Sequence, residues 1–424
     1  MDHKPKVYFI ACCFPPFGRG NAITNSCVAN NLVEDFDVEV VCMEREEGGM
    51  IAYQEDSSLE ETLHPRLGVR WVRATNWFGL NIILYALGVL PCYFLNWAWS
   101  VWRQRDKHFA EPGVVFAVYP VFSDLVLGYM ISRRYGWPLI ADFRDDFSGV
   151  MTRGWRKILR PFYRHLEKRI IETADRVSVT TEGLRTDLIN RYGFAGEKFE
   201  VVYNIVPPVP VSEVVEIGRD RGPLRIVYAG AMSRVQKPEI LLKAYTHLLA
   251  EDPGWSERLQ VELYGPESPY FSARIRKLLV SGSDFRGFRP QAEVTQQVAT
   301  ADIGFFSLSD ATYAYATPTK LFDYIEAGVP IIASLPQGAS RELIESYGIG
   351  LVAEAGDARE LADRIQEMAE NVELRVRCRA NMDSIRDQFR SNVQIGKWYK
   401  MLDELIVYRE EVGAFRTPGP ESER

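Results

Sequence analysis

Short apolar runs that each lead into a turn and a helix recur along this chain, and they restrict its fold more than any other feature. The first is KVYFIACC (6–13), followed by the loop FPPFGRGN (14–21) and a helical segment at 22–32. LRIVYAGAMS (224–233) restarts the pattern in the second half. Nearly continuous apolar strands are typical of parallel sheets covered on both faces by helices. The sequence therefore predicts an α/β fold with two doubly wound, Rossmann-like domains.

The length of 424 residues suits two domains that each bury a core. We expect the first at 1–208 and the second at 223–391. The segment 209–222 carries Pro, Gly and charge without a core pattern, which indicates a linker. A last helix is expected at about 392–412, and the tail 413–424 is expected to be mobile.

Composition excludes some functions. The net charge of −7 argues against a general nucleic-acid binder. The six cysteines show no metal-binding spacing, so we expect free thiols in a reducing compartment. The first strand begins almost at once, leaving no room for a cleavable signal before it. We therefore expect a cytoplasmic protein.

The stretch ATPTKLFDYIEAGVPIIA (316–333) reads as a loop, a helix start and a return to a strand. Thr317 is placed to be the N-cap, with Pro318 at the first helical position. A helix N-terminus exposes unpaired N–H groups and a partial positive charge, and Thr317, Thr319 and Lys320 add hydroxyls and an ammonium. These groups predict a phosphate site, with Pro318 inside it. A capped surface helix that binds nothing would show the same pattern.

This stretch also resembles the donor-binding segment of the retaining GT-B glycosyltransferases of the large family usually numbered four. That segment often shows Pro-Ser/Thr-Lys-Leu, an acidic residue, an aromatic residue and Ala-Gly-x-Pro. In that family the helix start holds the diphosphate of a nucleotide sugar and the acidic residue, Asp323 here, binds the ribose. Many members carry a glutamate eight positions earlier, where this chain has Tyr315. The sugar contacts of the paired-glutamate members therefore do not carry over.

The resemblance covers most of residues 5–410 and implies two facing Rossmann-like domains, with the C-terminal helix crossing back to the first. It also implies further donor contacts. The glycines of the loop 14–21 would let its backbone approach a phosphate closely. The loop lacks the third spaced glycine of a dinucleotide fingerprint, so it does not predict an NAD site. The donor-side candidates are Gly18 and Gly20 near the phosphates, Arg234 and Lys237 as catalytic cations on the departing diphosphate, and Phe288 and Arg289 at the base.

The run WPLIADFRDDF (137–147) predicts a strand that ends in a cluster of charged side chains. Ligands in parallel α/β sheets sit at the carboxyl ends of strands. The resemblance places this loop on the acceptor side, with Asp145 as the group that receives the acceptor hydroxyl proton. Its neighbours on the acceptor side would be Asp142, Arg144 and Asp146. An ordinary ion-pair network is the alternative.

The segment NIILYALGVLPCYFLNWAWSVW (81–102) is long enough to span a bilayer. Pro91 interrupts it, however, and it lies between two strands of one predicted sheet, so we do not expect it to cross. Two interpretations stay open: a pair of buried crossover helices, or an interfacial element with Trp97, Trp99 and Trp102 at headgroup depth.

The segment RGWRKILRPFYRHLEKR (153–169) carries seven Lys or Arg and one Glu. We expect Pro161 to divide it into short helices. It is either a solvated charged face or a surface for anionic lipid. The residues predicted to contact a membrane here are Arg153, Trp155, Arg156, Lys157 and Arg160.

Together these features predict a metal-independent, retaining glycosyltransferase without a cofactor, using a UDP- or GDP-sugar as donor. The acceptor would be a lipid-linked or membrane-located glycan in surface polysaccharide or lipopolysaccharide biosynthesis, with the enzyme peripheral on the cytoplasmic face. A non-catalytic partner subunit that binds nucleotide sugars and an epimerase of the same fold remain alternatives.

Overall fold

The computed structural model describes residues 4–18, 20–44, 55–75, 78–92, 94–151, 154–209, 222–266 and 269–412. The chain divides into two compact units, one made of 1–17, 21–203 and 394–424 and the other of 18–20 and 204–393. Most of the predicted linker 209–222 and the whole tail 413–424 lie outside the described residues.

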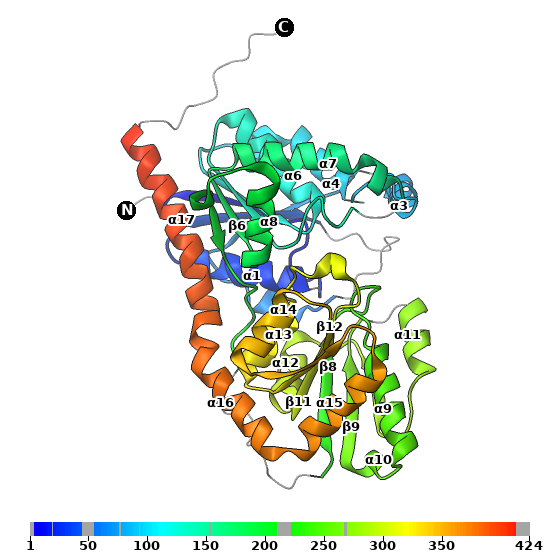
Figure 1. Ribbon diagram of the computed structural model, residues 1–424. Helices are drawn as coiled ribbons and strands as arrows, with labels where there is room; N and C mark the ends of the chain where they lie inside the picture. The colour runs from blue at the N-terminus through cyan, green and yellow to red at the C-terminus, as the bar shows by residue number, and fades with distance from the viewer. Residues whose placement is uncertain are drawn as a thin grey trace. The chain divides into compact units, whose positions relative to one another are not determined.

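The first unit contains a seven-stranded parallel sheet in the order β3-β2-β1-β4-β5-β6-β7. Helices α4, α6 and α7 lie on one side of this sheet and α1 on the other (Figure 1). The central strands are buried along their whole length, as their apolar sequences predict. The strands are β1 (Lys6–Ile10), β2 (Asp37–Met43), β3 (Gly68–Val72), β4 (Val114–Tyr119), β5 (Leu139–Phe143), β6 (Arg176–Val179) and β7 (Phe199–Val201). The helices are α1 (Gly20–Leu32), α2 (Ser58–Glu61), α3 (Phe78–Ala86), α4 (Leu95–Arg103), α5 (Arg105–His108), α6 (Phe122–Tyr135), α7 (Gly154–Thr173) and α8 (Glu182–Tyr192).

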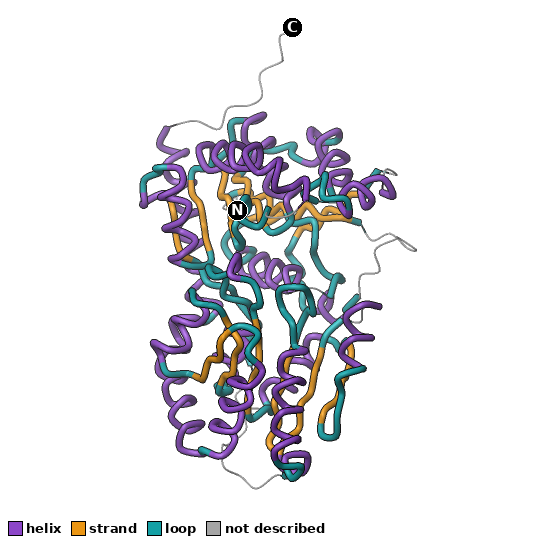
Figure 2. The backbone as a smooth tube through the Cα atoms, turned by 45° about the vertical axis from the view of Figure 1, so that its right-hand side comes forward, coloured by secondary structure: helices purple, strands orange, loops and turns teal. Residues whose placement is uncertain are grey.

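The second unit contains a six-stranded parallel sheet in the order β10-β9-β8-β11-β12-β13. In Figure 2 the strands of this sheet run between helices, as in the first unit. The strands are β8 (Leu224–Ala229), β9 (Leu259–Tyr264), β10 (Ser283–Gly287), β11 (Ile303–Ser307), β12 (Ile331–Leu335) and β13 (Gly350–Glu354). The helices are α9 (Glu239–Glu251), α10 (Trp255–Arg258), α11 (Pro269–Arg276), α12 (Gln291–Ala299), α13 (Thr319–Ala327), α14 (Ala339–Tyr347), α15 (Ala358–Glu370) and α16 (Val372–Phe389). Two doubly wound parallel sheets confirm the predicted fold class.

The last helix, α17 (Ser391–Val412), is counted with the first unit from Gln394 onward. Its Trp398 is buried and contacts Phe116 of β4, with 5.8 Å between ring centroids. Glu404 forms an ion pair with Arg176 at 2.5 Å. The chain thus returns to the first sheet after completing the second.

Two local predictions were wrong. Pro161 does not divide its segment, because α7 runs through it from residue 154 to 173. A proline costs a helix one hydrogen bond, and here Pro161 and Lys157, whose carbonyl would otherwise accept that bond, are solvent-exposed. Trp97 is not at the surface. Its side chain is 0% exposed, because α4 turns this face toward the core.

The predicted segment 81–102 forms α3 and α4 with a break around Pro91. It contains both buried side chains, such as Trp97, and exposed ones, such as Ile83 and Trp99, so burial alone does not decide between the two interpretations. Within the described part of the chain, no helix has the length and apolar character needed to cross a bilayer.

Candidate functional site

The strand order of the second sheet reverses between β8 and β11, which predicts a crevice beyond the ends of these two strands. These strands pair only at Ile226 with Ile303 and at Val227 with Gly304, and from β8 the chain proceeds outward to β9 and β10 before it returns to β11. Such a reversal of strand order leaves the loops beyond the two strand ends diverging, and ligands of open α/β sheets bind there. Helix α13 follows β11 and therefore starts at this crevice.

Tyr324 fixes α13 onto the two strands. Its hydroxyl donates to the carbonyl of Phe305 at 2.8 Å or of Val227 at 3.0 Å, so it bridges β11 and β8. A Cβ atom on Gly304 would lie 2.5 Å from the Tyr324 ring, so the ring approaches the strand only because residue 304 is glycine. This contact determines where the first turn of α13 lies.

The start of α13 differs by one residue from the prediction. Helical geometry begins at Thr319 and Pro318 is the N-cap, so Thr317 precedes the cap. Proline offers no side-chain acceptor, and the Thr317 hydroxyl is buried, at 3% exposure for the residue, without a hydrogen-bond partner among the described residues. The Thr317 carbonyl accepts from Asn204 Nδ2 at 2.8 Å. A buried hydroxyl without a partner is uncommon, and at a helix start it is a candidate to hydrogen-bond a ligand.

Lys320 lies in the first turn and reaches back to the end of β8. Its Nζ donates to Gln236 Oε1 at 2.6 Å and lies 5.1 Å from the centre of the Tyr228 ring. The residue is only 6% exposed, and burial lowers the pKa of its ammonium to about 8. A Cβ on Gly230 would lie 2.7 Å from Nζ, so the lysine packs directly on the strand end.

Asp323 is one turn further on and half-buried. Burial raises the pKa of its carboxyl to about 7, and the nearby Lys320 counteracts part of that rise. Lysine and aspartate thus both titrate near neutrality in the unliganded site. Tyr315, at the position of the absent glutamate, is buried with its ring 6.3 Å from that of Tyr313.

Glycines at the ends of β8 and β9 belong to this site, although the sequence pattern did not single them out for it. Gly230 donates to the Tyr264 carbonyl at 2.9 Å, and Gly265 donates to the Gly287 carbonyl at 3.0 Å. A Cβ on Gly265 would lie 2.3 Å from the Gly230 oxygen. The ends of the three neighbouring strands therefore pack closely through glycine backbone. Of these glycines, Gly265 and Gly287 are buried, whereas Gly230 is half-buried beside Lys320, where a ligand could approach the backbone closely.

Other predicted donor residues lie at the margins of this site. Arg234 and Lys237 are exposed, in the loop between β8 and α9. The loop backbone is fixed, because Ser309 Oγ donates to the Arg234 carbonyl at 2.9 Å and Ser307 Oγ to the Lys237 carbonyl at 3.1 Å. Their side chains are thus held only through the backbone.

The predicted base-binding pair follows β10. Phe288 is half-buried, and Arg289 is exposed. The Arg289 guanidinium donates to the Phe288 carbonyl at 3.0 Å and pairs with Glu293 at 3.2 Å. A base that used this carbonyl would compete with Arg289 for it.

In the first unit, the predicted acceptor-side residues are engaged in internal ion pairs. Arg144 pairs with Asp142 at 2.7 Å and donates to Asn25 Oδ1 at 2.9 Å. Asp146 pairs instead with Arg191 at 2.8 Å. The side chains of Asp142, Arg144 and Asp146 are therefore buried and held by partners within the first unit, although Arg144 Nη2 has no hydrogen-bond partner among the described residues. Their contact with the acceptor stays a prediction. Asp145 is half-buried between them in sequence and stays a candidate.

Asp124 was missed by sequence reasoning. It lies at the point in the first sheet where strand order reverses, between β1 and β4, and its Oδ2 accepts from the Cys12 backbone at 2.8 Å. Burial raises the pKa of this carboxyl well above its usual range. The Cys13 carbonyl next to it accepts from Asn25 Nδ2 at 2.9 Å. These bonds fix the start of the loop that carries Gly18 and Gly20, of which Gly20 is exposed at the first position of α1.

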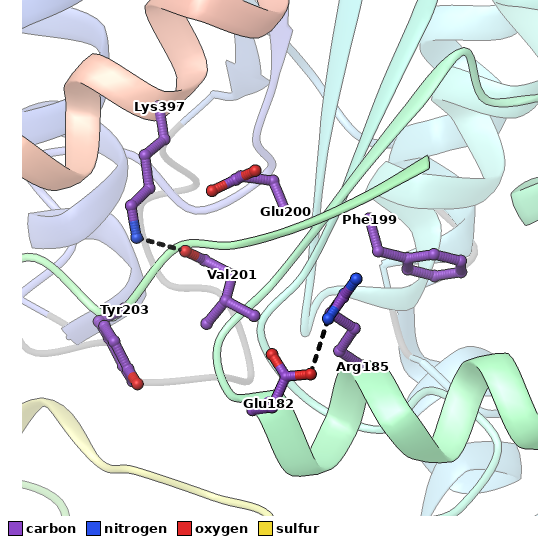
Figure 3. A pocket seen from close by; sticks show the side chains of 7 residues that line it. All are labelled: Glu182, Arg185, Phe199, Glu200, Val201, Tyr203 and Lys397. Carbon is purple, nitrogen blue, oxygen red and sulfur yellow. Dashed lines mark hydrogen bonds and ion pairs between the residues drawn. The ribbon is translucent and has the colours of Figure 1, made fainter. Parts of the chain in front are cut away.

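A hollow of about 390 Å³ at the β7 edge of the first sheet contains none of the predicted residues. Figure 3 shows Lys397 of α17 reaching the Val201 carbonyl, at 2.6 Å, and Glu182 paired with Arg185, at 2.7 Å. We interpret the hollow as part of the seam that fastens α17 to β7.

An apolar surface on α3 and α7 is exposed. Each helix presents large apolar side chains at the spacing i, i+3, i+7, which places them on one stripe. The residues of this α3–α7 face, each 54–65% exposed, are Leu80, Ile83, Leu87, Trp155, Ile158 and Phe162. Arg156 joins the two helices through the carbonyls of Tyr85 at 2.7 Å and Leu90 at 3.3 Å.

The remaining predicted membrane residues divide by exposure. Lys157 and Trp99 are exposed, whereas Arg160 and Trp102 are half-buried. The Arg156 guanidinium donates to the carbonyls of Tyr85 and Leu90. Arg153 lies outside the described residues. Within the described ranges, no group of three His, Cys, Asp or Glu side chains could hold a metal ion.

Two family models match the chain in succession. Residues 28–209 match Glycosyltransferase Family 4, and residues 213–384 match Glycosyl transferases group 1. Curated relatives include D-inositol 3-phosphate glycosyltransferases. That of a Nocardioides species is 23% identical over 50% of each chain, and that of Geodermatophilus obscurus is 23% identical over 74% of this chain and 70% of its own. The chain thus spans half the length of the first of these relatives.

A crystal structure of Anabaena HepE in complex with UDP and glucose has a similar fold. Its TM-score is 0.66 at 16% identity, over 94% of this chain and all of that one. At this identity the likeness concerns the fold, and it matches the GT-B arrangement of two Rossmann-like domains.

Proposed function

The two consecutive family matches and the fold support assignment of this chain to the GT-B glycosyltransferases, and we propose that it moves a sugar from a nucleoside diphosphate to an acceptor hydroxyl with retention of configuration. The observation that carries the proposal is the start of α13. There the buried Thr317 hydroxyl, which has no partner among the described residues, and the buried Lys320 ammonium lie at a helix N-terminus, beside Gly230 and the point where the strand order reverses between β8 and β11.

In this reaction the site has to stabilise the negative charge of the departing diphosphate. The acceptor oxygen forms a bond to the anomeric carbon while the bond from that carbon to the diphosphate oxygen breaks on the same face. The acceptor proton passes to the leaving phosphate oxygen or to Asp145. Lys320, the α13 N-terminus and the outer cations Arg234 and Lys237 neutralise the charge that develops on the phosphate. Asp323 accepts from the ribose hydroxyls.

The donor is a UDP- or GDP-sugar in this proposal, and neither a metal nor a cofactor takes part. UDP is the first nucleotide to test, because it is the one bound by the similarly folded HepE. We propose front-face displacement for the retaining reaction, because no carboxylate here is a convincing sugar nucleophile and Tyr315 stands where many family members carry the glutamate that touches the sugar.

We propose that the acceptor is lipid-linked or membrane-located, in surface polysaccharide or lipopolysaccharide synthesis on the cytoplasmic face. The α3–α7 face supports this. Large apolar side chains more than half exposed on two helices are unusual for a soluble domain, and Lys157 and Arg160 beside them suit anionic headgroups.

The direct test is to incubate the protein with UDP- and GDP-sugars, with and without membrane lipid extract, in EDTA. We expect release of nucleoside diphosphate that depends on the extract and a mass gain of one sugar on a lipid-linked product, whose anomeric configuration NMR then reads. Isomerisation of the donor would show an epimerase, and binding without turnover would show a partner subunit.

A further inference from the structure

The cation at the end of β8 comes from a distant part of the chain. The residue directly after Gly230 is Ala231, which carries no charge, and the cations of the following loop, Arg234 and Lys237, are exposed. Lys320 brings its ammonium to this strand end from α13, close enough that a Cβ on Gly230 would clash with it. Lys320 therefore places a buried ammonium at the end of β8, whereas the side chains of the two loop cations make no hydrogen bond or ion pair with this strand end among the described residues.

The hydrogen-bond partner of this ammonium is a neutral amide, although the Asp323 carboxyl also interacts with it electrostatically. An ammonium has three donors, and one of them goes to the amide oxygen of Gln236 at 2.6 Å. A carboxylate at this place would cancel the charge of Lys320, whereas an amide orients the ammonium and leaves its charge for an anion. A short hydrogen bond from a charged donor is stronger than a neutral one, which suits an orienting role.

The backbone of Gln236 is itself fixed. Its N–H donates to Ser233 Oγ at 3.0 Å, and its carbonyl accepts from the Ser233 N–H at 2.9 Å. The next residue, Lys237, donates its N–H to Ser307 Oγ at 3.2 Å, which ties the turn to the end of β11. The side chain of Gln236 thus projects from a closed turn, so its amide oxygen is held at a fixed place.

We propose that Gln236 is a positioning residue that holds the Lys320 ammonium toward the donor diphosphate, and that Lys320 contributes more to diphosphate binding than Arg234 or Lys237. This inference rests on the proposed function. It adds Gln236 to the proposed donor site and ranks Lys320, Arg234 and Lys237 by their contribution to diphosphate affinity.

The test is calorimetric titration with UDP and GDP of the wild type, Gln236→Ala, Gln236→Glu, Lys320→Met and Lys237→Met, with Gln260→Ala on the exposed side of β9 as the matched control. We expect Gln236→Ala to weaken binding roughly tenfold and Lys320→Met to weaken it further. Lys237→Met should weaken it by about threefold or less, as for an exposed cation, and Gln260→Ala should leave it unchanged. Thermal unfolding of each variant checks folding.

Gln236→Glu separates positioning from a merely structural role. A carboxylate beside Lys320 should weaken binding of the anion and, by stabilising the ammonium, move the loss of affinity at alkaline pH to higher pH. If wild type binds neither nucleotide, the proposed function fails. If wild type binds and the Gln236 variants match it in affinity and pH profile, or if Lys237→Met loses more than Lys320→Met, the positioning role of Gln236 or the ranking of the cations is wrong.

Discussion

At the scale of single residues, the candidate site contains an ammonium, on Lys320, and a carboxyl, on Asp323, and burial disfavours the charged form of both. Burial places the pKa of Lys320 at about 8 and that of Asp323 at about 7, so each is close to losing its charge in the unliganded protein. A diphosphate supplies the counter-charge that the buried ammonium lacks. Ligand binding and proton binding are therefore coupled here.

This coupling predicts a bell-shaped pH dependence of nucleoside diphosphate affinity with its maximum between about pH 7 and 8. Above pH 8 the free lysine is neutral and must take up a proton to bind, so affinity falls as pH rises. Below pH 7 the Asp323 carboxyl is protonated and accepts more weakly from the ribose, so affinity falls as pH drops. Calorimetry across pH 6–10 measures both limbs, and Lys320→Met should abolish the alkaline limb and keep the acidic one.

Thr317 gives a second prediction at this scale. Its hydroxyl is buried without a partner, which costs the unliganded protein about 1–3 kcal/mol. Replacement by valine, of nearly the same shape, should leave the free energy of unfolding equal or higher while nucleoside diphosphate affinity falls. Urea unfolding and calorimetry on one preparation measure the two quantities. A loss of stability would mean that the hydroxyl has a role in the fold itself.

At the scale of elements, the placement of α13 depends on the tyrosine that bridges β8 and β11. Removing the Tyr324 hydroxyl leaves the carbonyls of Val227 and Phe305 without that donor in a buried crevice. We expect Tyr324→Phe to lower the free energy of unfolding by roughly 1–3 kcal/mol and to weaken UDP or GDP binding, although the residue touches no ligand. Tyr245→Phe, which loses a buried hydroxyl bond to the Leu259 carbonyl, is the matched control. It should lose stability and keep its affinity.

The same elements show what could be predicted from sequence. Local composition identifies strands such as KVYFIACC and LRIVYAG, and capping signals identify the first turn of α13. The fold class and the positions of Lys320 and Asp323 near the start of this helix could therefore be predicted from the sequence. The residues that the sequence did not identify make their contacts with partners far along the chain. Gln236 is 84 residues from Lys320, Val227 is 97 from Tyr324, and Cys12 is 112 from Asp124. Local patterns carry no signal for such pairs.

The acceptor-side cluster shows the same dependence on distant partners. The cluster at Asp142–Asp146 looked like one guanidinium among three carboxylates, but a second arginine, Arg191, arrives from α8 and takes Asp146. The sequence showed that this loop is rich in charged residues, but it did not show that Arg191 is the partner of Asp146. Trp97 and Trp99 make the same point within one helix, since only helical phase decides that one is core and the other is exposed.

At the scale of the whole molecule, charge is unevenly distributed. The chain has a net charge of −7, yet α7 carries a strongly basic segment beside the apolar stripe Trp155, Ile158 and Phe162. Anionic lipid attracts such a segment by roughly 1 kcal/mol for each well-placed cation, and the exposed apolar side chains add burial in the interface. The neutral or zwitterionic bilayer supplies only the second contribution.

We therefore expect the protein to float with vesicles containing phosphatidylglycerol and much less with pure phosphatidylcholine, and high salt should reduce the difference. Serine at Trp155, Ile158 and Phe162 together should abolish flotation. Serine at Val372, Val376 and Val393, which are exposed apolar positions of α16 and α17, removes a comparable number of apolar side chains and should leave flotation intact. Both triple variants should retain UDP or GDP binding. If only the first of them loses transfer to a lipid-linked acceptor, the α3–α7 face is needed to bring the enzyme to its acceptor at the membrane. If transfer survives without flotation, the enzyme reaches its acceptor from solution. The membrane part of the proposal is then wrong, and the proposed donor site is unaffected.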